Sequence, residues 1–105
     1  MSKNAEQLKP IVVSLVASQH LDDVYTWYER KKVGLGKRFL SGVETTFQKI
    51  QQTPAGYPII HEQHRRLLMT KFPYWVFYEE QEIQIIISAV FHTSRNPDDW
   101  QNLLQ

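Results

Sequence analysis

The sequence contains no cysteine among its 105 residues. Disulfide bonds, thiolate nucleophiles and cysteine-ligated zinc are therefore excluded. Long apolar runs are also missing. The early run Ile11–Ala17 is interrupted by Ser14, and it is too short to span a bilayer or to resemble a signal peptide. We therefore expect a cytoplasmic protein that does not associate with membranes.

A strong charge of either sign is also absent, since the formal net charge is +1. Strong nucleic-acid binders usually have a dominant basic balance. Here residues 1–60 hold eight Lys or Arg against five Asp or Glu, whereas residues 61–105 hold four against six. Nucleic-acid binding would therefore need a local basic patch. The rest of the composition, 42% hydrophobic and 22% charged, is that of an ordinary globular protein.

Three consecutive β-strands are predicted in the second half of the chain. Residues Arg65–Phe72 alternate between two faces, and Tyr74–Glu79 is rich in aromatic and β-branched side chains. The charged run Glu79–Glu82 is expected to connect the second of these strands to the third. Ile83–Phe91 is apolar on both faces, which is typical of a central strand.

Two amphipathic helices are predicted in the first half. The first, Val16–Lys32, has Ser18 as its expected N-cap, and the second, Lys37–Gln52, follows two glycines that allow the chain to reverse. Apolar residues recur at helical spacing in both helices: Ala17, Leu21, Val24 and Tyr28 in the first, and Phe39, Val43, Phe47 and Ile50 in the second. If Phe47 is buried in this way, Phe47→Ala is expected to cost about 3–5 kcal/mol of stability.

The predicted order of elements is β-α-α-β-β-β-α. A short strand at Ile11–Leu15 begins it, a few strand residues at Ile59–His61 precede the three strands, and a short helix follows Pro97. A helical hairpin packed on one face of a mostly antiparallel sheet is an α+β fold, whose other sheet face would be partly open to partners. We expect a single domain over residues 11–105, preceded by a flexible extension over residues 1–10.

Three short motifs occur in order along the chain: GLGxxF at Gly34–Phe39, FPY at Phe72–Tyr74 and HxxRxPxxW at His92–Trp100. Other pieces accompany them, namely Ala17 with Leu21, Tyr28-Glu29, Pro54–Pro58, Arg65-Arg66 and Ala89–His92. Over about residues 11–100 the chain therefore resembles the RelE/ParE superfamily of toxins from type II toxin–antitoxin and plasmid-stabilisation modules, and more closely its ParE-like branch. His20 departs from the pattern, because many members have an acidic residue there.

The resemblance implies a RelE/ParE-like fold and two alternative activities. ParE-like members inhibit DNA gyrase and carry no obvious catalytic set, whereas RelE-like members cut messenger RNA on the ribosome. Either activity implies a cognate antitoxin, a largely disordered segment of which folds onto the toxin in a hetero-oligomer. The near-neutral charge favours gyrase inhibition over the endoribonuclease. A third alternative is a degenerate, non-toxic family member that only binds a partner.

The endoribonuclease alternative can be compared with the residues. Cleavage of RNA needs a group that takes the 2′-OH proton and cations that stabilise the charged transition state. Histidine is the side chain that most often transfers protons near neutral pH, so His92 is the candidate for this role. Arg65 and Arg95, together with Lys71, are the candidates for the phosphate. A histidine that anchors the tail of the chain through backbone hydrogen bonds is the structural alternative for His92.

The candidate partner-binding residues are Arg66, Lys71, Tyr78, Arg95 and Trp100. Arg65 and Arg66 lie on opposite strand faces, so one of them is expected to reach the open face and the other to pack over a helix. Arginine and tryptophan are enriched at interface hot spots, which makes Arg95 with Trp100 a candidate binding edge. The structural alternatives are that Trp100 caps the core and that Tyr78 is a core or rim residue.

A basic cluster, Arg30–Lys32 with Lys37 and Arg38, is expected at the tip of the helical hairpin. It is either a solvated helix end or a surface for an acidic partner or nucleic acid. The four histidines include no helical i, i+4 pair, and the neighbours His61 and His64 have no carboxylate beside them other than Glu62. We therefore expect no metal and no cofactor.

Overall fold

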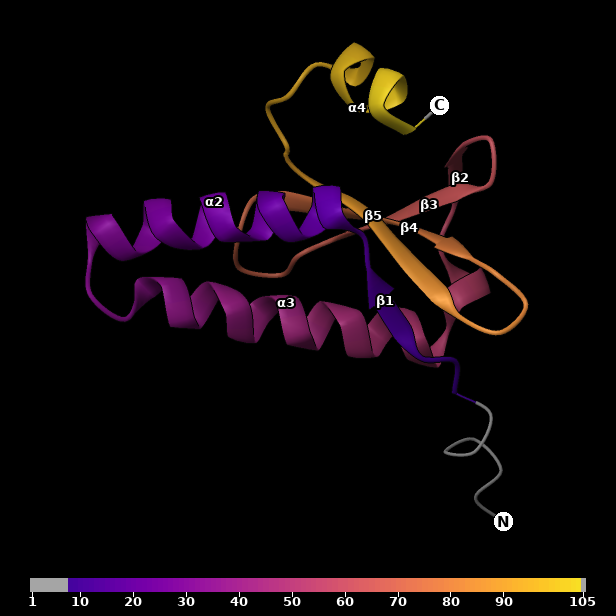
Figure 1. The fold of residues 1–105 in the computed structure, drawn as a ribbon, viewed down its shortest axis with the longest axis horizontal. Coiled ribbons are helices and arrows are strands. Elements are labelled where there is room, and N and C mark those ends of the chain that lie inside the picture. Colours follow the sequence, from indigo (N-terminus) through magenta and orange to yellow (C-terminus); the bar gives the residue numbers. More distant parts are fainter. Residues whose placement is uncertain (1–7, 105) are drawn as a thin grey trace.

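A five-stranded sheet organises the protein, with a long helical hairpin on one face (Figure 1). The computed structural model describes residues 8–104, so residues 1–7 of the predicted extension lie outside the described part. The elements are β1 (Ile11–Val13), α2 (Leu15–Lys31), α3 (Leu35–Gln52), the 3₁₀ turn η1 (Pro54–Gly56), β2 (Ile59–His61), β3 (His64–Leu68), β4 (Tyr74–Glu80), β5 (Ile85–His92) and α4 (Pro97–Leu104). The predicted α+β fold is confirmed, with Ile59–His61 as a separate strand.

The strand order in the sheet is β1-β5-β4-β3-β2, which makes β5 a central strand as predicted. β1 runs parallel to β5, and the other pairs are antiparallel. A β-bulge interrupts β5, because Phe77 pairs with Ala89 while Tyr78 pairs with Ile87, which leaves Ser88 as an extra residue. The bulge changes the alternation, so that both Ile87 and Val90 face the helical hairpin.

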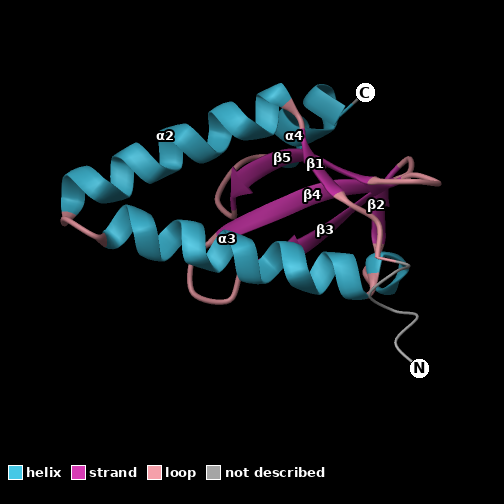
Figure 2. Ribbon diagram, turned by 60° about the horizontal axis from the view of Figure 1, so that its bottom comes forward, coloured by secondary structure: helices cyan, strands magenta, loops and turns pink. Residues whose placement is uncertain are grey.

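Different helices cover the two faces of the sheet (Figure 2). On one face, α2 and α3 bury an apolar core made by Ala17, Phe39, Val43, Ile50, Met69, Val76, Tyr78, Ile85, Ile87 and Val90. On the other face, α4 packs Trp100 and Leu104 against Phe77, Ala89 and Phe91. This second face is only partly open, since Val12 and Leu68 remain 41% and 45% exposed. Within residues 8–104 no helix is long and apolar enough to cross a membrane.

The start of α2 differs from the prediction. Ser14, rather than Ser18, is the N-cap, because its Oγ accepts a hydrogen bond from the backbone N of Ala17 at 3.1 Å. The backbone N of Ser14 also donates to Ile87 O at 3.0 Å, so the same residue ends the pairing of β1 with β5. Ser18 lies inside the helix, one turn further on. The helix follows the strand immediately, which fixes its position against β5.

The reversal between α2 and α3 depends on glycine, as predicted. Gly34 has a φ of 91°, a left-handed conformation that side chains other than glycine rarely adopt. The carboxylate of Glu29 accepts hydrogen bonds from the backbone N atoms of Gly34 and Gly36, both at 2.9 Å. Glu29 therefore satisfies two of the unpaired N–H groups at the start of α3. Gly36 is buried there against the side chain of Tyr25.

The predicted strand Arg65–Phe72 is too long at its end. β3 stops at Leu68, and the chain turns back through a loop over residues 69–73. The backbone N of Met69 donates to Tyr74 O at 3.0 Å and closes this loop. Pro73 has no N–H and could not have continued a ladder. Phe72 leaves the strand but enters the core, with its ring 5.0 Å from that of Tyr28.

The connection between β4 and β5 lies two residues further along the chain than predicted, at residues 81–84 instead of Glu79–Glu82. Glu79 and Glu80 belong to β4, where Glu80 pairs with Ile85. The turn is closed by the backbone N of Gln81, which donates to Gln84 O at 2.8 Å. The charge of Glu80 is compensated by Lys9, whose Nζ lies 2.9 Å from its carboxylate. A charged side chain at the end of a strand is therefore compatible with pairing in this sheet.

Candidate functional site

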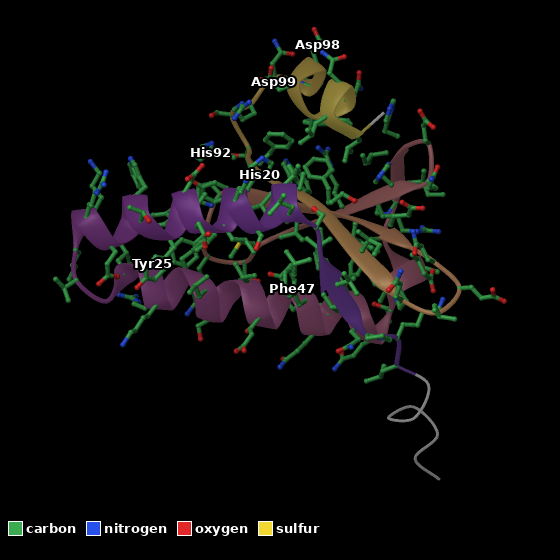
Figure 3. The ribbon with its side chains drawn as sticks, in the orientation of Figure 1. His20, Tyr25, Phe47, His92, Asp98 and Asp99 are labelled. Carbon is green, nitrogen blue, oxygen red and sulfur yellow. The ribbon has the colours of Figure 1, made fainter. Side chains whose placement is uncertain are left out.

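His92 lies at the end of β5 from which the chain runs to α4 (Figure 3). Its Nδ1 lies 3.0 Å from the backbone N of Ser94 and 2.8 Å from the Ser94 hydroxyl. Nδ1 must be unprotonated to accept the bond from the backbone N–H. The ring packs edge-on against Tyr74, with 5.1 Å between ring centroids. These contacts match the structural alternative, in which His92 anchors the tail of the chain. Nε2 is then the ring nitrogen that could still transfer a proton.

Arg95 lies beside His92 in the loop that precedes α4. Its backbone N donates to His92 O at 3.0 Å, and its Nε donates to Asp99 at 3.1 Å. The guanidinium carbon lies 5.0 Å from the centre of the Phe91 ring. The side chain remains half exposed, and its charge is partly compensated by the carboxylate of Asp99. Arg95 is therefore close to His92 but is engaged with its own helix.

Arg65 and Arg66 lie on opposite faces of β3, as predicted. Arg65 faces the helical hairpin, and its guanidinium donates to the backbone carbonyls of Ala55 and Tyr57. Arg66 faces α4, with its guanidinium carbon 3.8 Å from the Trp75 ring centre. Partial burial lowers the pKa of Arg66. Both arginines therefore hold neighbouring segments in place.

Arg65 is remote from His92 along the sheet. Arg65 pairs with Tyr78 on β4, whereas His92 pairs with Tyr74, four residues away. Four residues of strand span about 13 Å. The structure thus brings Arg95 to His92, but it does not bring Arg65 to them.

Tyr78 is fully buried, so the expectation that it contacts a partner is wrong for this structure. The alternation of β4, which also turns Val76 inward, directs its ring beneath the helical hairpin. Its hydroxyl donates to Pro54 O at 2.6 Å, which ties β4 to η1. Burial raises the pKa of Tyr78 to about 12, although the charge of Arg65 acts in the opposite direction. Tyr78 is therefore a core residue, which was the structural alternative considered for it.

Trp100 is also part of a core, with 8% of its surface exposed. Its ring lies 5.2 Å from Phe77 and 6.3 Å from His61, measured between centroids. Arg66 lies 5.7 Å from the Trp100 ring centre. The structural alternative, in which Trp100 caps the core, therefore describes its position under α4. Arg95 and Trp100 do not form one exposed edge.

His20 is a structural residue that sequence reasoning treated only as a departure from the family pattern. Its Nδ1 accepts a hydrogen bond from the backbone N of Val90 at 3.1 Å, beyond the point where β1 ends. Its ring lies 5.0 Å from that of Phe91. Burial lowers the pKa of His20, the charge of Arg95 lowers it further, and Asp23 raises it. The sequence did contain an indication of this structural role, because His20 lies beside Leu21 on the apolar face of α2.

This contact predicts that acid destabilises the protein through His20. Because its folded-state pKa lies below the ordinary 6.5, the unfolded chain binds the proton more readily, and stability falls as pH drops below that value. Urea unfolding at about pH 7.5 and about pH 5.5 should show this loss. His20→Asn keeps an acceptor for Val90 but does not titrate, so it should lose less stability. An equal loss in both proteins would contradict this role of His20.

Lys71 is exposed in the loop between β3 and β4, where it lines a surface cleft. The cleft has a volume of about 550 Å³ and lies between this loop and α3. Its lining residues are Leu35, Arg38, Ser41, Gly42, Thr45, Thr70, Lys71 and Phe72. Lys71 is the one predicted partner-binding residue that combines exposure with a concave surface.

A second groove lies between α2 and α3 and has a volume of about 450 Å³. Its lining residues are Leu21, Lys37, Leu40, Ser41, Val43, Glu44 and Phe47. Phe47 faces inward and packs against the core, as the apolar stripe predicts, but it is only half buried there. The groove mixes apolar side chains with one cation and one carboxylate.

The protein is therefore a small α+β domain with two grooves along its helical hairpin. Of the residues predicted for catalysis, Arg95 lies beside His92 and Arg65 lies apart from both. The family model described as the ParE toxin of type II toxin–antitoxin systems, parDE, matches residues 11–97, and the chain belongs to this family. A similar solved structure is titled "Chromosomal ParDE TA system from P. aeruginosa". The two share 16% sequence identity with a TM-score of 0.73, over 83% of this chain and 98% of that one. A search of the curated proteins finds no match.

Proposed function

We propose that this type II toxin acts in the cytoplasm by binding and inhibiting DNA gyrase, and that a cognate antitoxin neutralises it by forming a complex. The observation that carries this proposal is the dispersal of the groups needed to cleave RNA. Arg65 is bound to the backbone carbonyls of Ala55 and Tyr57. Arg95 is paired with Asp99, and Nδ1 of His92 is engaged with Ser94. A toxin that acts by occupying its target needs a shaped surface rather than a catalytic set.

The proximity of His92 and Arg95 supports a second candidate function, the ribosome-dependent endoribonuclease. The two residues are three positions apart, and within residues 8–104 Nε2 of His92 forms no hydrogen bond. Because Arg65 lies apart from this pair, binding to ribosomal RNA or messenger RNA would have to complete the catalytic site. The two candidates differ in their dependence on His92.

Expression of the protein alone, in a bacterial host that carries a DNA-damage reporter, tests the proposal. Gyrase trapped on DNA leaves broken strands, so we expect growth arrest together with a rising reporter signal. Arrest with a flat reporter and cleaved transcripts would support the endoribonuclease instead. Normal growth would support a non-toxic member that only binds a partner.

His92→Ala should retain full toxicity in the same host, because gyrase inhibition does not need proton transfer. Loss of the His92 contacts with Ser94 and Tyr74 is expected to loosen only the segment that leads to α4. Toxicity is measured as colony formation after induction, with protein levels checked by immunoblot. If the variant is expressed at the wild-type level and is harmless, gyrase inhibition without catalysis is contradicted.

A further inference from the structure

The turn that joins α2 to α3 forms one end of the molecule, away from the strands of the sheet (Figure 1). We call residues 27–38, from the end of α2 to the start of α3, the hairpin tip. The Glu29 carboxylate fixes its shape from within, because it accepts hydrogen bonds from the backbone N atoms of Gly34 and Gly36. The hairpin tip therefore projects from the domain with a defined shape.

The hairpin tip carries five cations and one carboxylate. The carboxylate is that of Glu29, which is engaged with the two backbone N–H groups, and the nearest other carboxylates along the chain are those of Asp23 and Glu44. Between positions 8 and 104 none of the five cations forms an ion pair, and all of them are exposed: Arg30, Lys31, Lys32, Lys37 and Arg38. The hairpin tip is therefore a local basic patch in a protein whose net charge is only +1.

The helix dipoles explain only part of this basic patch. The carboxyl end of a helix favours cations, so Arg30 and Lys31 stabilise the last turn of α2. Lys37, by contrast, lies in the first turn of α3, where the dipole disfavours a cation and where there is no acidic residue. Arg38 follows directly. Two basic side chains are thus placed where they do not stabilise their own helix, which indicates a role in binding.

Two large apolar side chains are exposed among these cations. Val33, at the reversal of the chain, is 88% exposed, and Trp27 is 53% exposed. The Trp27 ring packs edge-on against Tyr28, and Lys31 Nζ lies 4.8 Å from the centre of the Trp27 ring. Tryptophan and lysine side chains are both favoured at the interface between a membrane and water, where the apolar part is buried and the polar end stays hydrated.

We propose that the hairpin tip binds the surface of a membrane that contains anionic lipids. Val33 and the Trp27 ring would enter the headgroup layer, and the five cations would lie against lipid phosphates. Nucleic acid fits less well, because a phosphate backbone would use the cations but leave Val33 in water. The proposal goes beyond gyrase inhibition and does not depend on it.

Binding at a membrane surface differs from the expectation drawn from the sequence. That expectation of no membrane association rested on the lack of long apolar runs, and residues 8–104 indeed contain no helix that could cross a membrane. A peripheral contact needs no such helix, because it combines a few apolar side chains with attraction between cations and anionic lipids. The hairpin tip supplies both.

Co-sedimentation with vesicles tests this proposal without gyrase, so its failure would leave the gyrase assay unaffected. Wild-type protein should bind vesicles of equal parts phosphatidylglycerol and phosphatidylcholine, but not vesicles of phosphatidylcholine alone. Raising the salt concentration from about 0.1 M to about 1 M should weaken binding, because salt screens the charges. No binding to the anionic vesicles, or equal binding to both kinds, would overturn the proposal.

Lys37→Glu should weaken binding to the anionic vesicles by about fivefold or more, because each cation near an anionic surface contributes about that factor. Lys49→Glu is the matched control, since Lys49 is exposed on the same helix, about 18 Å further along its axis. It should bind within about twofold of wild type, because charges beyond a Debye length from the lipids are largely screened. Equal weakening by the two substitutions would overturn the proposal.

Val33→Ser and Ile83→Ser form the corresponding apolar pair. Ile83 is 75% exposed in the turn between β4 and β5, at the other end of the molecule (Figure 1). Val33→Ser should weaken binding to the anionic vesicles, whereas Ile83→Ser should not. Thermal melts should show that all four variants are folded, because the substituted positions are exposed. Equal binding by Val33→Ser and Ile83→Ser would contradict insertion of the hairpin tip.

Fluorescence locates the contact on the protein. Lipids with brominated acyl chains should quench the tryptophan fluorescence of the bound wild-type protein and leave that of Trp27→Phe nearly unchanged. Trp75 and Trp100 lie on the sheet face that α4 covers, so they supply the background signal. Quenching that persists in Trp27→Phe would place another surface on the membrane and overturn the proposal.

Duplex DNA is the competing polyanion. Added at the same phosphate concentration as the anionic lipid, it should leave most of the protein on the vesicles, because it offers no apolar layer to Val33 and Trp27. Displacement of the protein by the DNA would assign the hairpin tip to nucleic acid and overturn the proposal.

Discussion

Phe39→Ala should lower the free energy of unfolding by about 3–5 kcal/mol, which is the usual loss for a fully buried phenylalanine. Phe39 has no exposed surface. Its ring packs within 5.4–5.6 Å of the rings of Tyr28, Phe72 and Tyr74. Removing it leaves a cavity at the point where both helices meet the sheet. For a domain of this size the melting temperature should fall by roughly 12 °C or more.

Phe47→Ala provides the comparison on the same helix. The sequence pattern puts Phe39 and Phe47 on one stripe, but the structure leaves Phe47 half buried at the groove between α2 and α3. A half-buried ring loses fewer contacts, so we expect a loss of about 1–2 kcal/mol. Both variants are measured by urea denaturation under the same conditions. Equal losses would contradict the different burial of the two rings.

Gly36→Ala is expected to destabilise the protein by about 2–3 kcal/mol, because it overfills a tightly packed turn. An added Cβ would lie 2.7 Å from the Tyr25 ring and 2.8 Å from the Glu29 carboxylate. That carboxylate also accepts the hydrogen bonds of Gly34 and Gly36, so moving it would uncap the start of α3. The clash and the lost hydrogen bonds therefore act together. Thermal and urea unfolding measure the combined effect.

Gly42→Ala is the control for the same chemical change. Its added Cβ would meet the flexible end of Met69 at 3.1 Å, a contact that a small rotation relieves. Alanine also favours the helix over glycine by about 1 kcal/mol. We expect stability within about 1 kcal/mol of wild type. If Gly42→Ala destabilises the protein as much as Gly36→Ala, the Glu29 turn does not have the role described above.

The regular periodicities predicted most of the fold. Alternation put Arg65 and Arg66 on opposite faces, and helical spacing selected Ala17, Phe39 and Val43, all of which are buried. Periodicity predicts which side of an element faces inward, but it does not predict how deep a side chain lies. Depth depends on the elements that pack above it. This is why Phe47 was expected to be as buried as Phe39.

The errors arose where a contact between distant residues decides the local structure. Ser14 caps α2 in place of Ser18, and its position is fixed by pairing with Ile87, which is 73 residues away by number. Tyr78 is directed into the core, where its hydroxyl meets Pro54. His20 finds its partner at Val90 beyond the end of β1. None of these partners is visible in a local sequence pattern.

The candidate site was less predictable than the fold for the same reason. The proximity of His92 and Arg95 followed from their spacing, but the separation of Arg65 depends on the register of β3 against β4. The cleft beside Lys71 depends on the approach of a loop to Gly42, which is distant in sequence. Surface concavity is a property of packed elements. It became visible only when their arrangement was known.

Supercoiling of relaxed plasmid by purified DNA gyrase, with and without this protein, tests the central claim most directly. The account predicts that the wild-type protein blocks supercoiling and that His92→Ala blocks it equally well. Phe39→Ala serves as the control with a disrupted fold and should inhibit less. Full supercoiling in the presence of an excess of folded wild-type protein would contradict the claim that this toxin acts on gyrase.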